Sequence, residues 1–195
     1  MNLILEIAGV VLNLAFLIFL LMERKICWLY GILGSLVSIY LFYVTKLYSE
    51  CILYSYYVLM GFYGFYLWNQ TDDGKSSLKI SKWSLTNHIK TLILGFFLSL
   101  LLGYYFDKYS DAEKSYLDAF TTVFSFIATY LEAKKVLSAW IFWIILNGLS
   151  IYLYFTRGLN IYALLAVVYF FTSFFGYSVW KRKYDQLDYD LRYQR

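Results

Sequence analysis

The chain has 195 residues, of which 61% are hydrophobic and 23% aromatic, and its mean hydropathy is +0.57. Only 15% of the residues are charged, too few to cover the surface of a soluble domain, so the composition indicates a polytopic membrane protein. The formal net charge of +4 is spread over loops and the C-terminal tail, which is typical of membrane topology and excludes a nucleic-acid-binding domain.

Seven apolar runs bounded by charges follow one another, each long enough to cross a bilayer as a helix. They cover residues 2–22, 26–45, 50–68, 89–106, 116–133, 137–156 and 160–180. The loops are short apart from the polar linker 69–88, in or beside which His88 is expected as a solvated loop residue. The tail 181–195 either continues the last helix or lies along the lipid headgroups. The predicted fold is an all-α polytopic membrane protein with seven transmembrane helices.

The basic residues predict how these helices cross the membrane. Seven spans place the termini on opposite sides, and thirteen Lys and Arg residues then share the side of the C-terminus. The other side has four, which are Lys46, Lys108, Lys114 and Arg157. Because cytoplasmic loops carry the excess of basic residues, we expect the N-terminus outside and the C-terminus in the cytoplasm.

An internal repeat appears when the sequence is shifted by 112 residues, because 4–68 then aligns without a gap with 116–180. The matched pairs include Trp28 with Trp140, Ser38 with Ser150, Tyr57 with Tyr169, Gly64 with Gly176, Trp68 with Trp180 and the acids Glu6 with Asp118. Each repeat has three helices, and the single helix 89–106 between them makes the second repeat enter from the same side. The sequence therefore predicts 3+1+3 parallel repeats, as in transporters with a substrate site near the midplane.

This repeat divides the chain into four parts. Residues 1–68 form the first three-helix repeat, and 69–115 a cytoplasmic loop with the linker helix. Residues 116–180 form the second repeat, and 181–195 a cytoplasmic tail.

Polar and aromatic side chains form stripes along the helices of the second repeat. On the sixth predicted helix the stripe is Trp140, Trp143, Asn147, Ser150 and Tyr154, at steps of three and four. The fifth predicted helix carries Asp118, Thr122, Ser125, Thr129 and Glu132 at the same spacing. Because polar groups in membrane helices face protein or water, these stripes predict an internal polar path.

Structural roles compete with this interpretation at several positions. Trp28, Trp68 and Trp180 lie near span ends, where we expect them in the aromatic belts that anchor helices at the membrane surface. Small residues at Gly61, Gly64, Ser173 and Gly176 are expected to let helices approach closely, and Asn147 could hold two helices together instead of a ligand. Glu6 and Asp118 open their helices, where an acid either favours the positive end of the helix dipole or attracts cations.

The residue types in the stripes suit a small aromatic solute. Aromatic rings stack on Trp and Tyr, and a positively charged ring gains a further cation–π attraction. Amide and hydroxyl groups would hold a sugar or an amide by hydrogen bonds. An inorganic ion would instead require rings of carbonyl or carboxylate oxygens, and no such set is present in the sequence.

The chain resembles the Pnu-type vitamin transporters, a family that includes nicotinamide riboside transporters. The resemblance covers nearly the whole chain and is most specific in 118–159, followed by GYSVW at 176–180. In the first half it is carried by CWLYGILGS (27–35), KLYSE (46–50) and YGFYLW (63–68). It implies a homotrimer similar in helix count to SWEET sugar transporters, facilitated diffusion of a vitamin precursor without an ATPase, and trapping by a cytoplasmic kinase.

The site motif of this family reads WxxWxxxN, and Trp140, Trp143 and Asn147 match it. Two positions depart from the family pattern. The family often has Gln on the third helix where this chain has Tyr54, and Glu-Asn before the first Trp where this chain has Ser138 and Ala139. A phenol has one hydroxyl and is a poorer partner for a carboxamide than an amide is. Thiamine, whose thiazolium is also a cationic ring, therefore stays open beside nicotinamide riboside.

The sequence thus predicts a facilitator for nicotinamide riboside in the bacterial inner membrane, with a small-molecule vitamin substrate and the lipid bilayer as its partners. The predicted substrate-binding residues are Trp140, Trp143, Asn147, Tyr54, Ser35, Tyr57 and Tyr169. No catalytic residue, metal site or cofactor is predicted, and no nucleic acid. Two alternatives remain, a membrane enzyme and a sensor that binds the vitamin without moving it.

Overall fold

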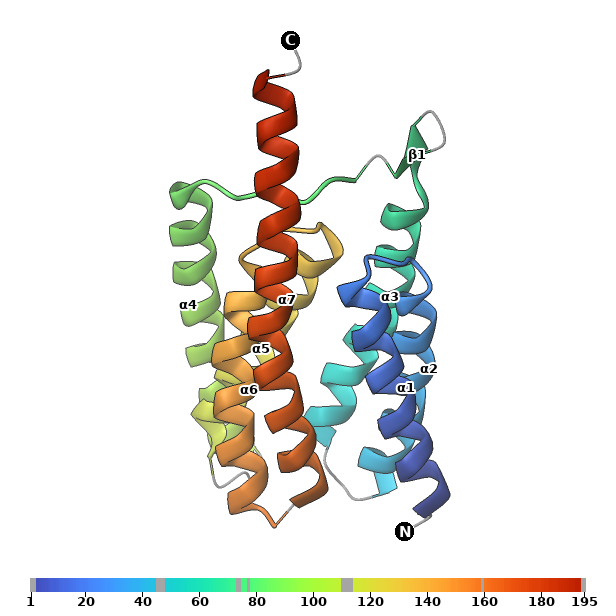
Figure 1. The fold of residues 1–195 in the computed structure, drawn as a ribbon. Helices are drawn as coiled ribbons and strands as arrows, with labels where there is room; N and C mark the ends of the chain where they lie inside the picture. Colours follow the sequence, from blue (N-terminus) through green and yellow to red (C-terminus); the bar gives the residue numbers. More distant parts are fainter. Residues whose placement is uncertain are drawn as a thin grey trace. The chain divides into compact units, whose positions relative to one another are not determined.

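The computed structural model describes residues 3–44, 48–72, 75–76, 78–109, 114–158 and 160–193. Within these ranges the chain forms seven helices and one short hairpin (Figure 1). The helices are α1 (Leu3–Leu21), α2 (Cys27–Val44), α3 (Tyr48–Asn69), α4 (Leu85–Tyr109), α5 (Ser115–Ala133), α6 (Ala139–Thr156) and α7 (Asn160–Tyr193). Each of the seven predicted spans thus coincides with a helix.

The main departure from the predicted elements concerns the linker, and the tail follows one of its two predicted alternatives. Residues in the linker form an antiparallel pair of two-residue strands, β1 (Thr71–Asp72) and β2 (Lys75–Ser76). Helix α4 begins at Leu85, four residues before the predicted span. At the other end of the chain, α7 runs on as one helix into the tail (Figure 1, red).

His88 therefore lies on a helix, and its prediction as a solvated loop residue is wrong. Its Nδ1 lies 2.9 Å from the carbonyl oxygen of Ser84, and its Nε2 lies 2.9 Å from Ser138 Oγ. The sequence did not indicate this because the pairing with Ser138 joins residues fifty positions apart.

The chain divides into two compact units. The first unit comprises Met1–Lys79 together with Ala133–Lys135, and it holds α1, α2 and α3, which pack in sequence order. The second unit comprises Ile80–Glu132 and Val136–Arg195, and it holds α4 to α7, with a close α6–α7 pair. All packing described below lies within one unit or the other.

A tryptophan packed on a glycine joins the second and third helices of each predicted repeat. In the first unit, Trp28 of α2 lies against Gly64 of α3, and its ring meets that of Trp68 edge to face at 5.6 Å. In the second unit, Trp140 lies against Gly176 and meets Trp180 edge to face at 5.4 Å. A Cβ at either glycine would come within 2.6 Å of the indole, so the close approach predicted at Gly64 and Gly176 is confirmed.

The aromatic-belt prediction for Trp28, Trp68 and Trp180 is wrong, because all three side chains are buried, the most exposed at 4%. The glycines make room for the indoles inside each unit, so these rings contribute to helix packing and do not face the membrane surface. Trp68 is further held by its indole N–H, which donates to the carbonyl oxygen of Ala133 at 2.8 Å.

The turns after α1 and α5 share an unusual backbone conformation. Glu23 and Lys135 have positive φ angles of 55° and 50°, a region that residues other than glycine seldom adopt. The two positions are 112 residues apart, so the predicted repeat aligns them. The Lys135 ammonium pairs with the Glu23 carboxylate at 3.0 Å and lies over the Trp68 ring, 4.6 Å from its centroid. These contacts help to offset the cost of the strained turns.

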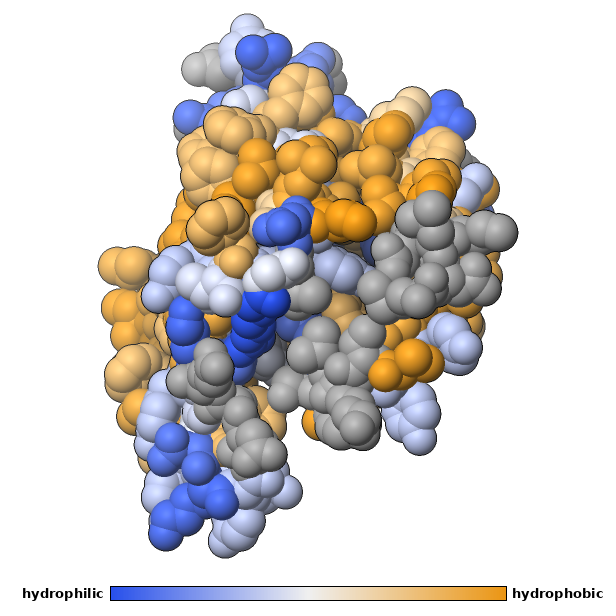
Figure 2. Space-filling model, turned by 90° about the horizontal axis from the view of Figure 1, so that it is seen from below, coloured by the Kyte–Doolittle hydropathy of each residue, from blue (hydrophilic) through white to orange (hydrophobic). Residues whose placement is uncertain are grey.

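The outer surface of the helices is largely apolar, as a lipid-facing surface requires. Large hydrophobic side chains are exposed along the helices, and apolar groups cover much of the face in Figure 2. Within the described residues, four helical stretches are long and apolar enough to span a membrane: 27–44, 85–109, 139–156 and 160–190. Helices α3 and α5 are not among these four stretches and carry many Tyr, Ser and Thr residues.

Candidate functional site

The polar stripe of α6 meets polar groups of two other helices within the second unit. The indole N–H of Trp143 donates to Oε2 of Glu132 on α5, at 2.9 Å. One turn further along α6, the amide of Asn147 donates to the hydroxyl of Ser173 on α7, at 3.3 Å. The Ser173 hydroxyl in turn donates to the backbone carbonyl of Tyr169, at 2.7 Å. We call Glu132, Trp143, Asn147, Tyr169 and Ser173 the polar cluster.

Helical spacing explains how these residues meet. Trp143 and Asn147 are four residues apart on α6, as are Tyr169 and Ser173 on α7, so each pair shares one face of its helix. Beside the polar cluster, Trp143 packs against an apolar group that includes Phe124, Ala128 and Leu146. Ala128 is fully buried, and its small side chain leaves space for a large ring nearby.

The electrostatics of the polar cluster are dominated by one acid. Glu132 is 3% exposed, and the phenol of Tyr169 lies within its electrostatic range. Among the described residues, Lys135 pairs with Glu23 and Arg157 with Asp118, and no basic side chain pairs with Glu132. The polar cluster therefore offers hydrogen-bond acceptors and an aromatic face, which suit a positively charged aromatic ring better than an anion.

Trp140, the first tryptophan of the predicted motif, lies one turn before Trp143 and is 2% exposed. Its ring contacts Gly176 and Trp180, in the arrangement that Trp28 has in the first unit. The buried indole N–H groups of Trp140 and Trp28 both lack a hydrogen-bond partner within the described residues. Because the two positions share this feature, it reflects packing, and a substrate contact of Trp140 stays a prediction.

The remaining predicted substrate-binding residues lie in the first unit. Ser35 is buried on α2. On α3 the rings of Tyr54 and Tyr57 meet edge to face at 5.2 Å, and Tyr54 also lies 5.2 Å from the ring of Phe42. The structure thus brings Trp143, Asn147 and Tyr169 together in the second unit, and Tyr54 and Tyr57 together in the first.

The acids that open the first helix of each repeat are only partly described. Asp118 forms a short ion pair with Arg157 near the start of α5, and Lys114 donates to the Thr156 hydroxyl at 2.9 Å. These contacts tie the start of α5 to the end of α6. The side chain of Glu6 lies outside the described residues.

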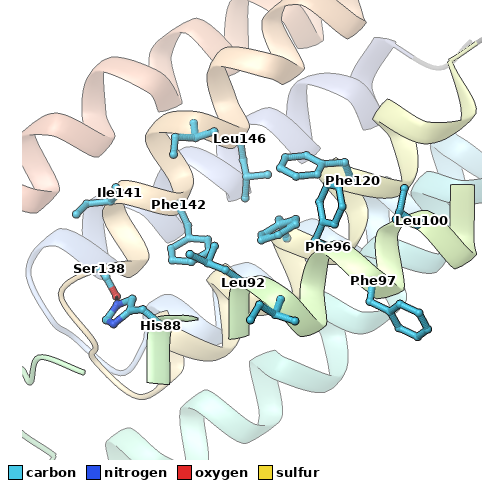
Figure 3. Close-up of a pocket in the computed structure, with 13 residues that line it drawn as sticks. His88, Leu92, Phe96, Phe97, Leu100, Phe120, Ser138, Ile141, Phe142 and Leu146 are labelled. Atoms are coloured by element: carbon cyan, nitrogen blue, oxygen red, sulfur yellow. Dashed lines mark hydrogen bonds between the residues drawn. The ribbon is translucent and has the colours of Figure 1, made fainter. Parts of the chain in front are cut away.

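An apolar groove of about 820 Å³ also lies in the second unit (Figure 3). His88 and Ser138 are side by side at one end, bonded to each other, and the other lining residues are Leu, Ile and Phe from α4, α5 and α6. Such a lining suits hydrocarbon. It offers no stacking Trp or amide for a charged vitamin, and it contains none of the predicted substrate-binding residues.

Two members of the polar cluster were absent from the predicted substrate-binding set. Glu132 ends the polar stripe of α5, and its charge deep in the sequence of that stripe, fourteen residues after Asp118, was the available signal. Ser173 was expected to let helices approach closely. Its spacing of four from Tyr169 places it on the same face, but the partner on α6 could not be read from the sequence. Among the described residues, no group of three or more His, Cys, Asp or Glu side chains could hold a metal ion.

Comparison with known proteins gives two matches. A family model described as "Nicotinamide mononucleotide transporter" matches residues 3–182. A solved structure titled "Crystal structure of the Vitamin B3 transporter PnuC" is similar in fold, with a TM-score of 0.80 and 21% sequence identity. The match covers 95% of this chain and 83% of that chain. Because the family model covers nearly all of the helical region, the chain is a membrane protein that belongs to the nicotinamide mononucleotide transporter family.

Proposed function

We propose that the chain is a facilitator that carries a vitamin precursor with a cationic aromatic ring, nicotinamide riboside, across the bacterial inner membrane. The observation that supports this most directly is the polar cluster, in which Trp143 and Asn147 of α6 bond polar groups of α5 and α7. Stacking of the cationic ring on Trp143 supplies cation–π attraction, about 2 kcal/mol once desolvated. The Asn147 amide binds the carboxamide or ribose.

The other predicted residues complete the proposed path. Tyr54, Tyr57 and Ser35 are the proposed substrate contacts of the first unit, and Trp140 and Tyr169 are further proposed contacts of the second. The family description names the mononucleotide, which carries a phosphate. We favour the riboside because the polar cluster contains no basic side chain, and a phosphate would need one.

The proposed mechanism is alternating access between two parallel three-helix repeats, α1–α3 and α5–α7, with α4 as the linker. It is supported by the matching Trp–Gly–Trp packing of the two units and by the positive φ angles at Glu23 and Lys135. The N-terminus is proposed to face the outside and the C-terminus the cytoplasm, following the distribution of basic residues. The protein is proposed to act as a homotrimer, and a cytoplasmic kinase traps the vitamin.

Thiamine is the second candidate, favoured by the two departures from the family pattern. Tyr54 packs with Phe42 and Tyr57 in an aromatic group, and Ser138 bonds His88 in a position where the family often has an acid. Neither residue offers the amide or carboxylate that the family pattern supplies there. A ring system without a carboxamide, such as the thiazolium of thiamine, would not need them.

Calorimetric titration of the purified protein tests the proposal, with nicotinamide riboside, nicotinamide mononucleotide and thiamine as ligands. Tight binding of the riboside with uptake into liposomes is the expected result. Binding of thiamine alone would select the second candidate, and tight binding of the mononucleotide would refute the preference against phosphate. Binding without flux would identify a sensor, and chemical turnover of the bound vitamin an enzyme.

A further inference from the structure

The carboxylate of Glu132 is buried more deeply than its contacts explain. Oε2 accepts a hydrogen bond from the Trp143 indole. Oε1 is buried and has no hydrogen-bond partner among the described residues. Buried polar atoms in proteins are nearly always paired, and exceptions call for a water, an ion or a ligand. The vacant acceptor at Oε1 is therefore a position at which a donor from outside the described residues can bind.

Helix packing does not require an acid at this position. The predicted repeat aligns Glu132 with Leu20 of the first unit, which is 1% exposed and fills its place with hydrocarbon. An apolar side chain can therefore occupy this position near the end of a helix and remain buried inside a unit. In a membrane helix an ionisable residue carries a large desolvation cost and generally marks a functional position.

The surroundings of Glu132 indicate what kind of donor it meets. The carboxylate lies at the N–H edge of the Trp143 indole. A ring stacked on the face of Trp143 would have its edge substituents on the same side as this carboxylate. Asn147 lies one turn away on α6, and Tyr169 lies within electrostatic range on α7. Glu132 thus bonds one predicted substrate-binding residue, Trp143, and lies within electrostatic range of a second, Tyr169.

We propose that Glu132 is a specificity-determining residue whose Oε1 accepts a hydrogen bond from an N–H donor at the edge of the substrate ring. Its Oε2 holds the Trp143 indole in place for stacking. The proposal rests on the proposed function, because it assigns the acid to the same vitamin site. The substrate class is a vitamin precursor that has a cationic aromatic ring and carries an amide or amino group on one of its rings. The analogue with a carboxylate in place of the amide is rejected because it lacks the N–H donor.

Matched ligand pairs test this proposal in titrations of the full-length protein. Nicotinamide riboside and nicotinic acid riboside differ only in amide against carboxylate, and thiamine and oxythiamine differ in amino against oxo. Wild-type protein is expected to bind the amide or amino member of one pair at least tenfold more tightly than its counterpart. Glu132→Gln is expected to bind that member at least tenfold more weakly than wild type does. Its affinities for the two members of the pair are then expected to differ by no more than about threefold.

The result distinguishes a substrate contact from a purely positioning role. If Glu132 only oriented Trp143, Glu132→Gln would weaken both members of a pair equally, and the unchanged ratio would overturn the proposal. Glu132→Leu, which copies the residue at position 20, is a second variant expected to fold and to lose the discrimination. Glu23→Gln removes an acid that pairs with Lys135 and is expected to leave the ratio at its wild-type value.

Failure of the proposed function would be seen separately. If wild-type protein bound none of the four ligands, the proposed function would be wrong and this assignment would fall with it. If it bound one pair without discrimination, the vitamin site would stand and the role of Glu132 would be refuted.

Discussion

The helix sets α1–α3 and α5–α7 pack alike and differ in polar content. Both place a tryptophan of the second helix on a glycine of the third, edge to face with another tryptophan. Among the described residues, in contrast, the polar cluster is found in the second set alone. A shift of 112 residues pairs Tyr169 with Tyr57 and the other members Glu132, Trp143, Asn147 and Ser173 with Leu20, Gly31, Ser35 and Gly61. The comparison separates a shared packing scaffold from chemistry added to one half.

Between the first and second helices of each set lies a large aromatic ring, and the helix that supplies this ring differs between the two sets. In the first unit, a Cβ on Gly31 would lie 2.9 Å from the ring of Phe16, so α1 supplies the ring and α2 the space. In the second unit, the aligned residues are Trp143 and Ala128, so α6 supplies the ring and α5 the space. The exchange keeps the volume filled while it gives α6 an indole with a hydrogen-bonding edge.

Adding a methyl group at the shared glycines should have the largest effect on stability. Gly64→Ala and Gly176→Ala would each place a Cβ within 2.6 Å of an indole, which must shift. We expect each to destabilise the protein by about 1–3 kcal/mol, the range for overpacked sites. Thermal melting of the detergent-solubilised protein, followed by size-exclusion chromatography, measures this loss.

Gly148→Ala is the matched control, because its Cβ would meet Phe170 at an ordinary 3.5 Å. It should melt close to wild type. A clear loss at Gly176 with none at Gly64 would break the comparison, since the two sites would then not be equivalent.

Trp143→Ala should have the next largest effect, on binding. It removes the proposed stacking face and the donor to Glu132, and loss of a cation–π contact of about 2 kcal/mol corresponds to roughly thirtyfold weaker binding. Trp143→Phe keeps an aromatic ring but lacks the N–H, so its affinity should lie between those of wild type and Trp143→Ala. Calorimetric titration gives the affinities, and circular dichroism checks that the helices remain. Unchanged affinity in Trp143→Ala would remove the polar cluster from the site.

The sequence predicted the helices well because apolar length and bounding charges are local signals. The partners of buried tryptophans are not local. Trp28, Trp68 and Trp180 lie near span ends, which favoured the belt interpretation, and only the glycines of a neighbouring helix show that they are internal. The polar stripe predicted Trp143 and Asn147, but the contact of Trp143 with Glu132 depends on how α5 and α6 pack, which spacing along one helix does not determine.

Asn147→Ser should have a moderate effect, because it gives α6 the residue that α2 has at Ser35. A serine is too short to replace the amide contact with Ser173 and has one hydroxyl in place of an amide. Loss of one net hydrogen bond of about 1 kcal/mol predicts roughly fivefold weaker vitamin binding. Ser35→Ala should change affinity less. Calorimetric titration compares both variants with wild type. A larger loss of affinity in Ser35→Ala than in Asn147→Ser would contradict the assignment of Asn147 to the vitamin site.

Asp118→Asn should have the smallest effect, on stability. The Asp118–Arg157 pair is partly exposed, and the predicted repeat aligns Arg157 with Thr45, which has no charge. Exposed pairs contribute about 0.2–1 kcal/mol and weaken with salt. A double-mutant cycle with Arg157→Gln, followed by thermal melting at low and high salt, isolates the coupling. A coupling within this range that falls with salt would mean the pair only fastens α5 to α6. If the melting temperature were unchanged and uptake of the vitamin slower, Asp118 would instead attract cations, which is the second of the two roles predicted for it from the sequence.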